Sequence, residues 1–503
     1  MAAGSRSQVQ ALAGRTTRTL RVPGVALPGL SDAHLHVEEI GEQLERLDLR
    51  GLPKEQLLAK VAEAARAAPP GGWVLGEGWD EGFWTPAVFP GPAELDAVSA
   101  GHPVVLDRID GHSTWVSSAV LALAGISKDT PDPAGGRILR DATQRATGVL
   151  VDNAQDLIHP LIPRPTRADR ERRIRAALGQ LSRWGLTSAH DASVDLGGID
   201  IYRALAKSGE LPVRIYVMAA GEGARAHYLS VGPEIDLGHG MLTVRSFKLF
   251  LDGALGSRGA ELSQPYADAP SEHGLELMSD AELERIVRSA RQHGFQVATH
   301  AIGDLAVHRA LDAFEKAGVT ATDRFRIEHA SIVTDSDLMR FARLGIVASV
   351  QPVFVGEYGR WAEARVGPQR ARWVLRTRDF LAAGVPVASG SDFPASDSGS
   401  PIAALHCLVT RQSAAGQTGW HSEQRLDVDQ ALRTMTFGPA YAAFQEQDRG
   451  SLRVGRYADF TALSASPYEV PPGELRTLSV LATVVGGRVT YEASTAPAHR
   501  SIP

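Results

Sequence analysis

Residues 280–318, DAELERIVRSARQHGFQVATHAIGDLAVHRALDAFEKAG, contain the pattern that decides the fold. The first part, 280–294, has apolar residues at helical spacing and ends in glycine, which commonly stops a helix. The next part, 295–304, is an apolar run that ends in His300 and further polar residues. Residues 304–318 are again amphipathic and again end in glycine. This order of helix, strand and helix predicts an α/β fold with a parallel sheet.

The same order recurs along most of the chain. Seven further strand-like apolar runs lie at 27–36, 186–192, 213–219, 244–253, 325–331, 346–352 and 385–394, and all but 213–219 have a polar residue near their end. Eight strand–helix units predict a TIM-like (β/α)8 barrel, in which chemistry takes place at the C-terminal ends of the strands. Such ends carry His34, His36, His190, Lys248, His300, His329 and Asp392. We therefore expect these side chains to gather at one mouth of the barrel.

The rest of the chain falls outside the repeating pattern. We expect residues 28–445 to form the barrel, with a large insertion of about 38–185 after the first strand. The insertion has a strand-like run at 102–108 and a helix-like run at 115–125. Short β-branched runs with glycine turns in 446–503 predict a small β-rich accessory piece. Residues 1–27 would add a β stub to that piece.

Composition narrows the classes of partner. The chain has 503 residues, a net charge of −6 and 44% hydrophobic residues. This mildly acidic balance favours a small-molecule substrate over nucleic acid, and no apolar run reaches the ~20 residues of a membrane span. The single cysteine, Cys407, cannot form an internal disulfide, which fits the cytoplasm. A homodimer is compatible with these features. The first 31 residues contain four arginines and no Asp or Glu, a composition that also occurs in transit peptides. The alternation of apolar and polar residues in this segment favours a strand instead.

The residues at the strand ends suggest a metal centre. His34 and His36 are two apart, so in a strand they point to the same face. Four histidines and an aspartate suit two divalent metal ions, above all Zn²⁺. Lys248 would repel a cation as an ammonium, but it could bridge two ions after reacting with CO₂ to form a carbamate. The alternative for Lys248 is an ion-paired lysine, although its apolar neighbours make an unpaired charge costly.

Several motifs together resemble the metal-dependent amidohydrolase superfamily, and most closely its YtcJ-like branch. The matching segments run over nearly the whole chain: LPGLSDAHLHV (27–37), DGHSTWVSSAVLALAGI (110–126), GGRILRDATQRATGVL (135–150), FKLFLDGALGSRGA (247–260), THAIGD (299–304), RIEHAS (326–331), ASGSDFP (388–394) and GRYADFTAL (455–463). They are specific for fold and metal centre, and much less specific for substrate.

The resemblance implies a role for each matching residue. His34 and His36 would bind the more buried metal ion, and His300 and His329 the second one. Lys248 would bridge the two ions, carbamylated. Asp392 would be a ligand and the proton shuttle of the reaction, although a helix N-cap is the alternative for an aspartate before a turn.

The insertion supplies candidate substrate-binding residues. It is rich in aromatic side chains, and we expect residues of about 70–150 to form a wall of the pocket with His112, Trp79 and Trp84 facing the substrate. The alternative is that these residues pack the insertion's own core. Arg258, in the segment after Lys248, is a further candidate for substrate binding.

The predicted activity is hydrolysis of a C–N bond in an amide, imide or N-formyl-type compound, outside peptide bonds. A hydroxide held by the metal ions would attack the carbonyl carbon. Three alternatives stay open: a mononuclear deaminase, an esterase or lactonase, and a non-catalytic scaffold. The resemblance implies a glutamate after the histidine of THAIGD in a deaminase, and this chain has Asp304 instead.

Overall fold

The computed structural model describes residues 6–15, 17, 19, 22, 24–108, 112–133, 135–412 and 419–494. The chain forms two compact units, which are described separately. Unit 1 comprises Met1–Ile40 and Ile174–Pro503, and unit 2 comprises Gly41–Arg173. The insertion is therefore shorter than the predicted 38–185. The reason lies in α6 (Arg167–Arg183), whose buried Ile174, Leu178 and Leu181 belong to the hydrophobic core of unit 1.

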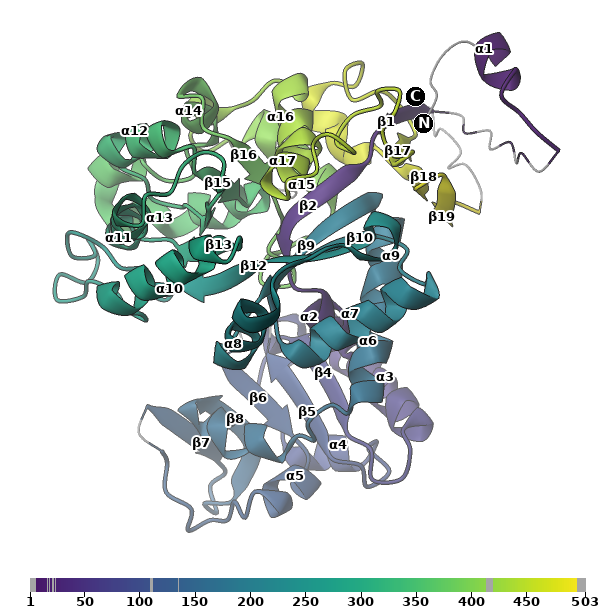
Figure 1. Ribbon diagram of the computed structural model, residues 1–503. Helices are drawn as coiled ribbons and strands as arrows, with labels where there is room; N and C mark the ends of the chain where they lie inside the picture. The colour runs from purple at the N-terminus through teal and green to yellow at the C-terminus, as the bar shows by residue number, and fades with distance from the viewer. Residues whose placement is uncertain are drawn as a thin grey trace. The chain divides into compact units, whose positions relative to one another are not determined.

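Unit 1 contains the predicted parallel barrel (Figure 1). Its eight strands, in chain order, are β2 (Leu30–Leu35), β9 (Leu186–Val194), β10 (Arg214–Ala219), β12 (Leu242–Phe250), β13 (Gln296–Ala301), β14 (Arg326–His329), β15 (Val347–Val350) and β16 (Val387–Ser389). Each strand pairs in parallel with the next one. All eight strands were expected from the apolar runs, so the fold class is confirmed.

The ring of strands is completed between β2 and the segment after β16. The amide of Asp392 donates to the carbonyl of His34 at 2.7 Å, and the amide of His36 donates to the carbonyl of Phe393 at 3.0 Å. A Cβ at Gly390 would lie 2.4 Å from the amide nitrogen of His34, so only glycine permits this approach. The junction places two ligand-bearing segments, 34–36 and 392, side by side.

Helices alternate with the strands along unit 1. They are α7 (Leu196–Ser208), α8 (Glu222–Val231), α10 (Asp280–Gln292), α11 (Asp304–Lys316), α12 (Asp335–Leu344), α13 (Val355–Ala371), α14 (Thr377–Ala382), α15 (Pro401–Thr410), α16 (Val428–Met435) and α17 (Phe437–Ala442). The boundaries of α12 follow from its sequence. The Thr334 hydroxyl accepts from the Asp337 amide as an N-cap, and Gly345, at φ +67°, ends the helix.

Alternation along the strands separates an apolar outer face from a polar interior. On β12, Phe247 and Leu249 belong to the hydrophobic core, whereas Lys248 between them faces the other way. On β14, Ile327 belongs to the same core, and its neighbours Arg326 and Glu328 are fully buried. The polar side chains inside the barrel are therefore set by the pleat of each strand.

A small antiparallel sheet draws on both ends of the chain. Its order is β1 (Val25–Pro28), β17 (Phe460–Leu463), β18 (Val480–Val485) and β19 (Arg488–Glu492). The β-rich accessory piece was expected, but the strand-like run at 450–467 forms only one short strand. Gly450 and Gly455 adopt positive φ there and interrupt it. The strand-like run at 18–30 falls partly on residues outside the described ranges.

Unit 2 is built on a mixed six-stranded sheet, of which only β5 was expected as a strand. The order is β3 (Leu47–Asp48), β4 (Val74–Trp79), β5 (Val104–Arg108), β6 (Ser113–Val116), β8 (Ala146–Asp152) and β7 (Gly136–Arg140). The first three strands run parallel and the other pairings are antiparallel. Helices α3 (Lys54–Ala67), α4 (Pro92–Asp96) and α5 (Ser118–Leu123) belong to this unit, and α2 (Val37–Glu45) spans its boundary.

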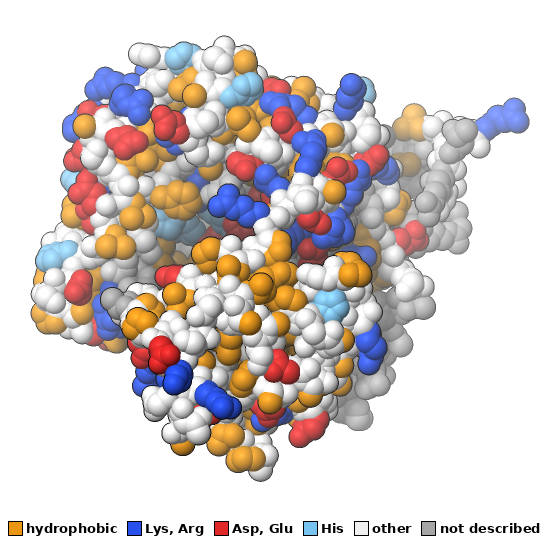
Figure 2. Space-filling view, turned by 90° about the horizontal axis from the view of Figure 1, so that it is seen from below, with side chains coloured by type: hydrophobic (Ala, Val, Ile, Leu, Met, Phe, Trp, Pro, Cys, Tyr) orange, Lys and Arg blue, Asp and Glu red, His pale blue; other side chains and the backbone are white. Residues whose placement is uncertain are grey.

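Acidic and basic side chains are interspersed on the face shown in Figure 2. None of the described helices is both long and apolar enough to cross a membrane. The expectations of a cytoplasmic protein without nucleic-acid partners, and of a homodimer, stay predictions.

Candidate metal centre

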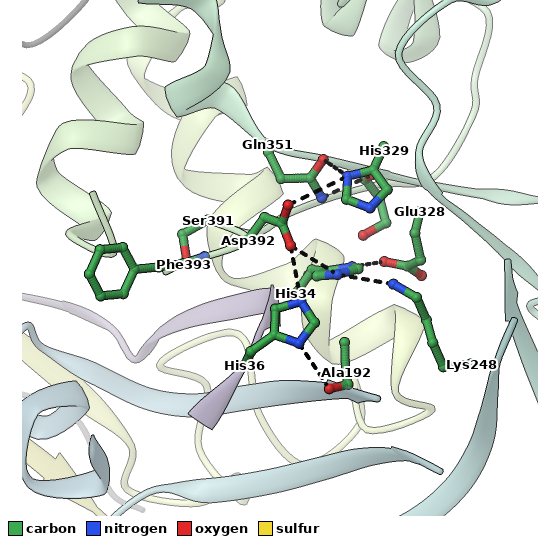
Figure 3. A network of polar contacts seen from close by, with 12 residues as sticks. His34, His36, Ala192, Lys248, Glu328, His329, Gln351, Ser391, Asp392 and Phe393 are labelled. Carbon is green, nitrogen blue, oxygen red and sulfur yellow. Dashed lines mark hydrogen bonds and ion pairs between the residues drawn. The ribbon is translucent and has the colours of Figure 1, made fainter. Parts of the chain in front are cut away.

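His34 and His36 leave the end of β2 on the same face, as their spacing predicts. Nδ1 of His34 lies 2.5 Å from Oε2 of Glu328, and Nδ1 of His36 donates to the carbonyl of Ala192 at 3.1 Å. Both Nε2 atoms point to one carboxylate: Oδ1 of Asp392 is 3.3 Å from His34 and 3.2 Å from His36 (Figure 3). Each ring is thus fixed through Nδ1 and offers Nε2, which is how metal-binding histidines are held.

Asp392 lies in a constrained turn after β16. Its φ of +62° is in the left-handed region, which is unfavourable for aspartate. The turn is fixed by the buried Asp32, whose carboxylate accepts from the amides of Ser391 and His34 at 2.9–3.1 Å. Burial alone would raise the pKa of Asp392, but His329, His34 and His36 hold that pKa below its ordinary value. The next described helix begins at Pro401, so Asp392 does not serve as an N-cap.

Lys248 lies within the same cluster. Its side chain is buried, and Nζ is 3.2 Å from Nε2 of His34 and 4.8 Å from the ring centre of Phe250. Burial lowers the pKa of Lys248 to about 8, against the partly opposing effect of Glu328 and Asp392. A larger share of neutral amine makes this lysine a suitable nucleophile for CO₂.

His300 and His329 leave the neighbouring strands β13 and β14. Their ring centres are 4.5 Å apart, and His329 is 4.9 Å from His34. Nδ1 of His329 bonds to Oε1 of Gln351 at 3.0 Å, and the residue has a φ of +71°. Burial lowers the pKa of His329 to about 3 and that of His300 well below its ordinary value. Both rings are therefore neutral at physiological pH, as metal ligands must be.

This arrangement fits divalent ions. His34, His329 and Asp392 offer one ligand atom each within 4.8 Å of one another, and all three are buried. Ligand atoms on one zinc ion, at about 2.0–2.2 Å from the metal, lie roughly 3.3 Å apart. That separation matches the contacts of Asp392 with both histidines of β2. The six residues expected to hold metal are thus brought together in one cluster.

Sequence reasoning missed the residues that support this cluster. Glu328, on β14, contacts His34, while Arg326 donates to Glu328, to the carbonyl of Ala33 and to Oγ of Ser349. Gln351 holds His329. The signal for Glu328 was present, because it directly precedes His329 and shares the interior face of β14 with Arg326.

His190 also ends an apolar run, but its contacts are with Arg326 and Tyr216, which are not candidate metal ligands. Its Nδ1 is 2.9 Å from Nη1 of Arg326, and its ring is 5.0 Å from that of Tyr216. Burial and the nearby guanidinium groups of Arg326 and Arg449 lower the pKa of His190 well below its ordinary value. His190 therefore helps to hold Arg326 inside the barrel.

The candidate substrate-binding residues of the insertion have contacts within unit 2. Trp79 and Trp84 are buried, with ring centres 5.8 Å apart, and Trp115 is 6.1 Å from each. Nε1 of Trp79 donates to the carbonyl of Leu106 at 2.7 Å. The faces and polar atoms of these two rings are used in the unit's own core, which favours the core-packing alternative over contact with a substrate.

His112 and Arg258 are polar and accessible. The His112 side chain is 74% exposed and contacts Oδ1 of Asp152 at 2.7 Å. Arg258, in unit 1, pairs with Asp268 at 3.0 Å, and Asp268 also pairs with Arg365. The partner of Arg258 is thus a carboxylate of its own loop, and substrate binding by these two residues stays a prediction.

Comparisons with known proteins agree with this geometry. A sequence model of the amidohydrolase family matches residues 24–491. YtcJ of Bacillus subtilis (strain 168), an amidohydrolase by its name, is 34% identical over 93% of this chain and 89% of its own length. An N-substituted formamide deformylase of Arthrobacter pascens is 28% identical over 97% of this chain and 92% of its own. The crystal structure of an uncharacterized metal-dependent hydrolase from Pyrococcus furiosus superimposes with a TM-score of 0.73, at 29% identity over 88% of each chain.

Proposed function

This chain belongs to the amidohydrolase family, and on that premise we propose that it hydrolyses the C–N bond of a small amide, imide or N-formyl compound with two divalent metal ions, Zn²⁺ above others. One observation carries the proposal: four histidines, a buried lysine and an aspartate converge at the strand ends of the barrel. When bound, such ions lower the pKa of water and polarise a carbonyl group.

The chain's own residues would then divide the work. His34 and His36 would hold one ion, and His300 and His329 the other. The Nζ of Lys248, next to His34, would join the two as a carbamate. Asp392 presents Oδ1 to the two β2 histidines, while its Oδ2 lies 4.0 Å from Nδ1 of His329. This carboxylate would take the proton of the attacking water and pass it to the leaving nitrogen.

Two observations favour an N-substituted formamide or a similar compound. The formamide deformylase of Arthrobacter pascens matches nearly the whole chain. In addition, Phe250 is 40% exposed, although its ring centre lies 5.4 Å from that of His300. An accessible aromatic face beside the reactive groups suits an apolar substituent on the substrate's nitrogen.

The alternatives are less well supported by the side chains. A mononuclear deaminase would use the acid after the β13 histidine, but the carboxylate of Asp304 accepts from the amide and the hydroxyl of Ser263. A non-catalytic scaffold would not require so many buried ligand-type groups. An esterase or lactonase uses the same chemistry, and only substrates can distinguish it.

Metal analysis and a substrate panel test the proposal. We expect close to two divalent ions per chain after reconstitution, with turnover of N-substituted formamides faster than that of matched esters or amino-heterocycles. His34→Ala should lose metal and activity together. A reconstituted protein that binds no metal with His34 and His36 intact would refute the metal centre, and faster ester turnover would favour the esterase.

A change at Phe250 tests the substrate class separately. Phe250→Ala should raise KM for formamides with an aromatic substituent and leave KM for N-methylformamide nearly unchanged, because only the larger substituent reaches the ring. Metal content serves as the control and should stay at the wild-type value. Equal effects on both substrates would contradict the assignment of this ring.

A further inference from the structure

Asp252 is a buried carboxylate that the catalytic scheme does not use. It follows β12 directly, four residues after Lys248, and only 1% of its surface is exposed. A carboxylate buried without a cation beside it is costly, and burial raises the pKa of Asp252 to about 7. Such a group needs a structural reason to be there.

The backbone holds the Asp252 carboxylate from two loops. Oδ2 accepts from the amides of Gly303 at 2.7 Å and Glu261 at 2.9 Å, and Oδ1 accepts from the amide of Ile302 at 3.0 Å. The two loops lie in close contact, since a Cβ at Gly303 would lie 2.0 Å from the carbonyl oxygen of Glu261. The carboxylate cannot turn away without giving up these bonds.

The fixed carboxylate faces His300. Oδ1 of Asp252 lies 3.5 Å from Nε2 of His300. That nitrogen is buried and makes no hydrogen bond within the described part of the chain. The side chain of His300 is 12% exposed, so its accessible surface belongs to the other atoms of the ring. A neutral histidine that binds metal through Nδ1 carries its proton on Nε2, which then needs an acceptor.

We propose that Asp252 is the positioning residue of His300: it accepts the Nε2 proton and so presents Nδ1 to the metal ion. The inference rests on the proposed metal centre. It also explains why the acid lies just after β12, since Asp252 then couples the segment after the strand of Lys248 to the strand of His300. His329 has the opposite arrangement, with Nδ1 held by Gln351 and Nε2 left for the metal.

The test compares Asp252→Asn with a matched control, Asp304→Asn. Asp304 is also buried and also ties the 252–263 loop to the start of α11, but it contacts Ser263 and no metal-ligand candidate. Zinc affinity is measured by competition with a chromogenic chelator, and visible absorption is recorded after cobalt substitution. The Asp252→Asn variant should bind the more weakly held of the two metal ions 10- to 100-fold less tightly than the wild type does. Its absorption spectrum after cobalt substitution should also differ from that of the wild type. Asp304→Asn should lower the melting temperature and keep both metal readouts.

A double-mutant comparison separates positioning from general damage. In a His300→Ala background, Asp252→Asn should cause no further loss of zinc affinity, because its effect passes through the missing ring. The proposal would be overturned if the two substitutions caused additive losses of zinc affinity. It would also be overturned if Asp252→Asn alone kept the zinc affinity and the cobalt spectrum of the wild type. If Asp252→Asn does not fold, a crystal structure of the zinc-loaded wild type decides: Nδ1 of His300 on zinc is expected, and Nε2 on zinc contradicts it. A wild type without any bound metal would instead refute the proposed function.

Discussion

Lys248 is buried next to His34, and this burial makes an ordinary ammonium group unfavourable, although the ring of Phe250 under its Nζ would attract a cation. Burial lowers its pKa to about 8, from the 10.5 of a solvated lysine, so the fraction of neutral amine increases as the pH rises through 8. Carbamate formation requires that neutral amine. At the scale of the single residue, this environment supports the proposed carbamate of Lys248.

Reactivation of the metal-free enzyme tests this role. Zinc added in CO₂-free buffer should restore little activity until bicarbonate is supplied, and reactivation should accelerate between about pH 7 and 9 for the reason given above. Lys248→Ala should be inactive and partly rescued by short carboxylic acids. Full activity in Lys248→Arg would contradict the bridging role, because a guanidinium does not form the carbamate.

Asp392→Asn tests the proton shuttle. The amide keeps the size of the side chain but cannot accept a proton, so kcat should fall roughly 10²-fold or more. The basic limb of the pH–rate profile should also change, because no group carries the proton to the leaving nitrogen. Circular dichroism shows whether folding is retained, and metal content shows whether the loss of a metal ligand accounts for part of the fall in kcat. A normal kcat on the best substrate of the panel would end this assignment.

The candidate metal ligands were more predictable than the residues that support them. A histidine at the end of an apolar run is conspicuous, and His34, His36, His300 and His329 follow that rule. Glu328 and Asp252 are carboxylates within or just after strands, and their partners come from other strands. Glu328 could be noticed by its place beside His329, but only the folded barrel brings His34 to Glu328 or His300 to Asp252, so local sequence does not reveal which residues they contact.

At the scale of the element, β14 shows how a strand can carry a polar interior. Arg326 is fully buried and donates to Glu328, the carbonyl of Ala33 and Ser349, all inside the barrel. Arg326→Met removes the cation and leaves the carboxylate of Glu328 buried without its partner. We expect a loss of about 3–5 kcal/mol in the free energy of unfolding, measured by urea denaturation.

A control and a second readout accompany this variant. Arg343→Met, on the exposed surface of α12, removes an ion pair with Glu315 and should change the unfolding free energy by less than about 1 kcal/mol. Because Glu328 contacts His34, Arg326→Met should also weaken zinc binding. Unchanged stability and unchanged zinc affinity would show that the buried network is dispensable.

All eight barrel strands were predictable, whereas only β5 was predicted among the strands of unit 2. Most barrel strands are apolar runs with a polar residue at or near their end, which is visible in sequence. In unit 2, β3 has only two residues, and β4 contains Gly76 and Gly78, which read as a turn. Trp115 was assigned to a helix-like run, but β6 pairs with β5 and β8 instead. Tertiary pairing decided these strands against weak local signals.

At the scale of the whole molecule, the two units have hydrophobic cores of their own. Trp79→Ala should therefore destabilise unit 2 by about 3–5 kcal/mol while the metal content stays that of the wild type. Thermal unfolding followed by tryptophan fluorescence and elemental analysis measure the two effects. His112→Ala, on an exposed side chain, is the control. A changed substrate preference with unchanged stability in Trp79→Ala would instead support a pocket-facing ring.

The left-handed backbone at His329 and Asp392 has a consequence for protein engineering. Each such residue costs about 1–3 kcal/mol of conformational strain, which glycine would relieve. Asp392→Gly relieves that strain but also removes the contacts of the carboxylate with His34 and His36, so the melting temperature of the metal-free protein measures the difference between the two effects. Wherever relief of strain is the larger effect, a library of variants selected only for heat resistance would enrich inactive enzymes, so selection for stability has to be paired with selection for turnover.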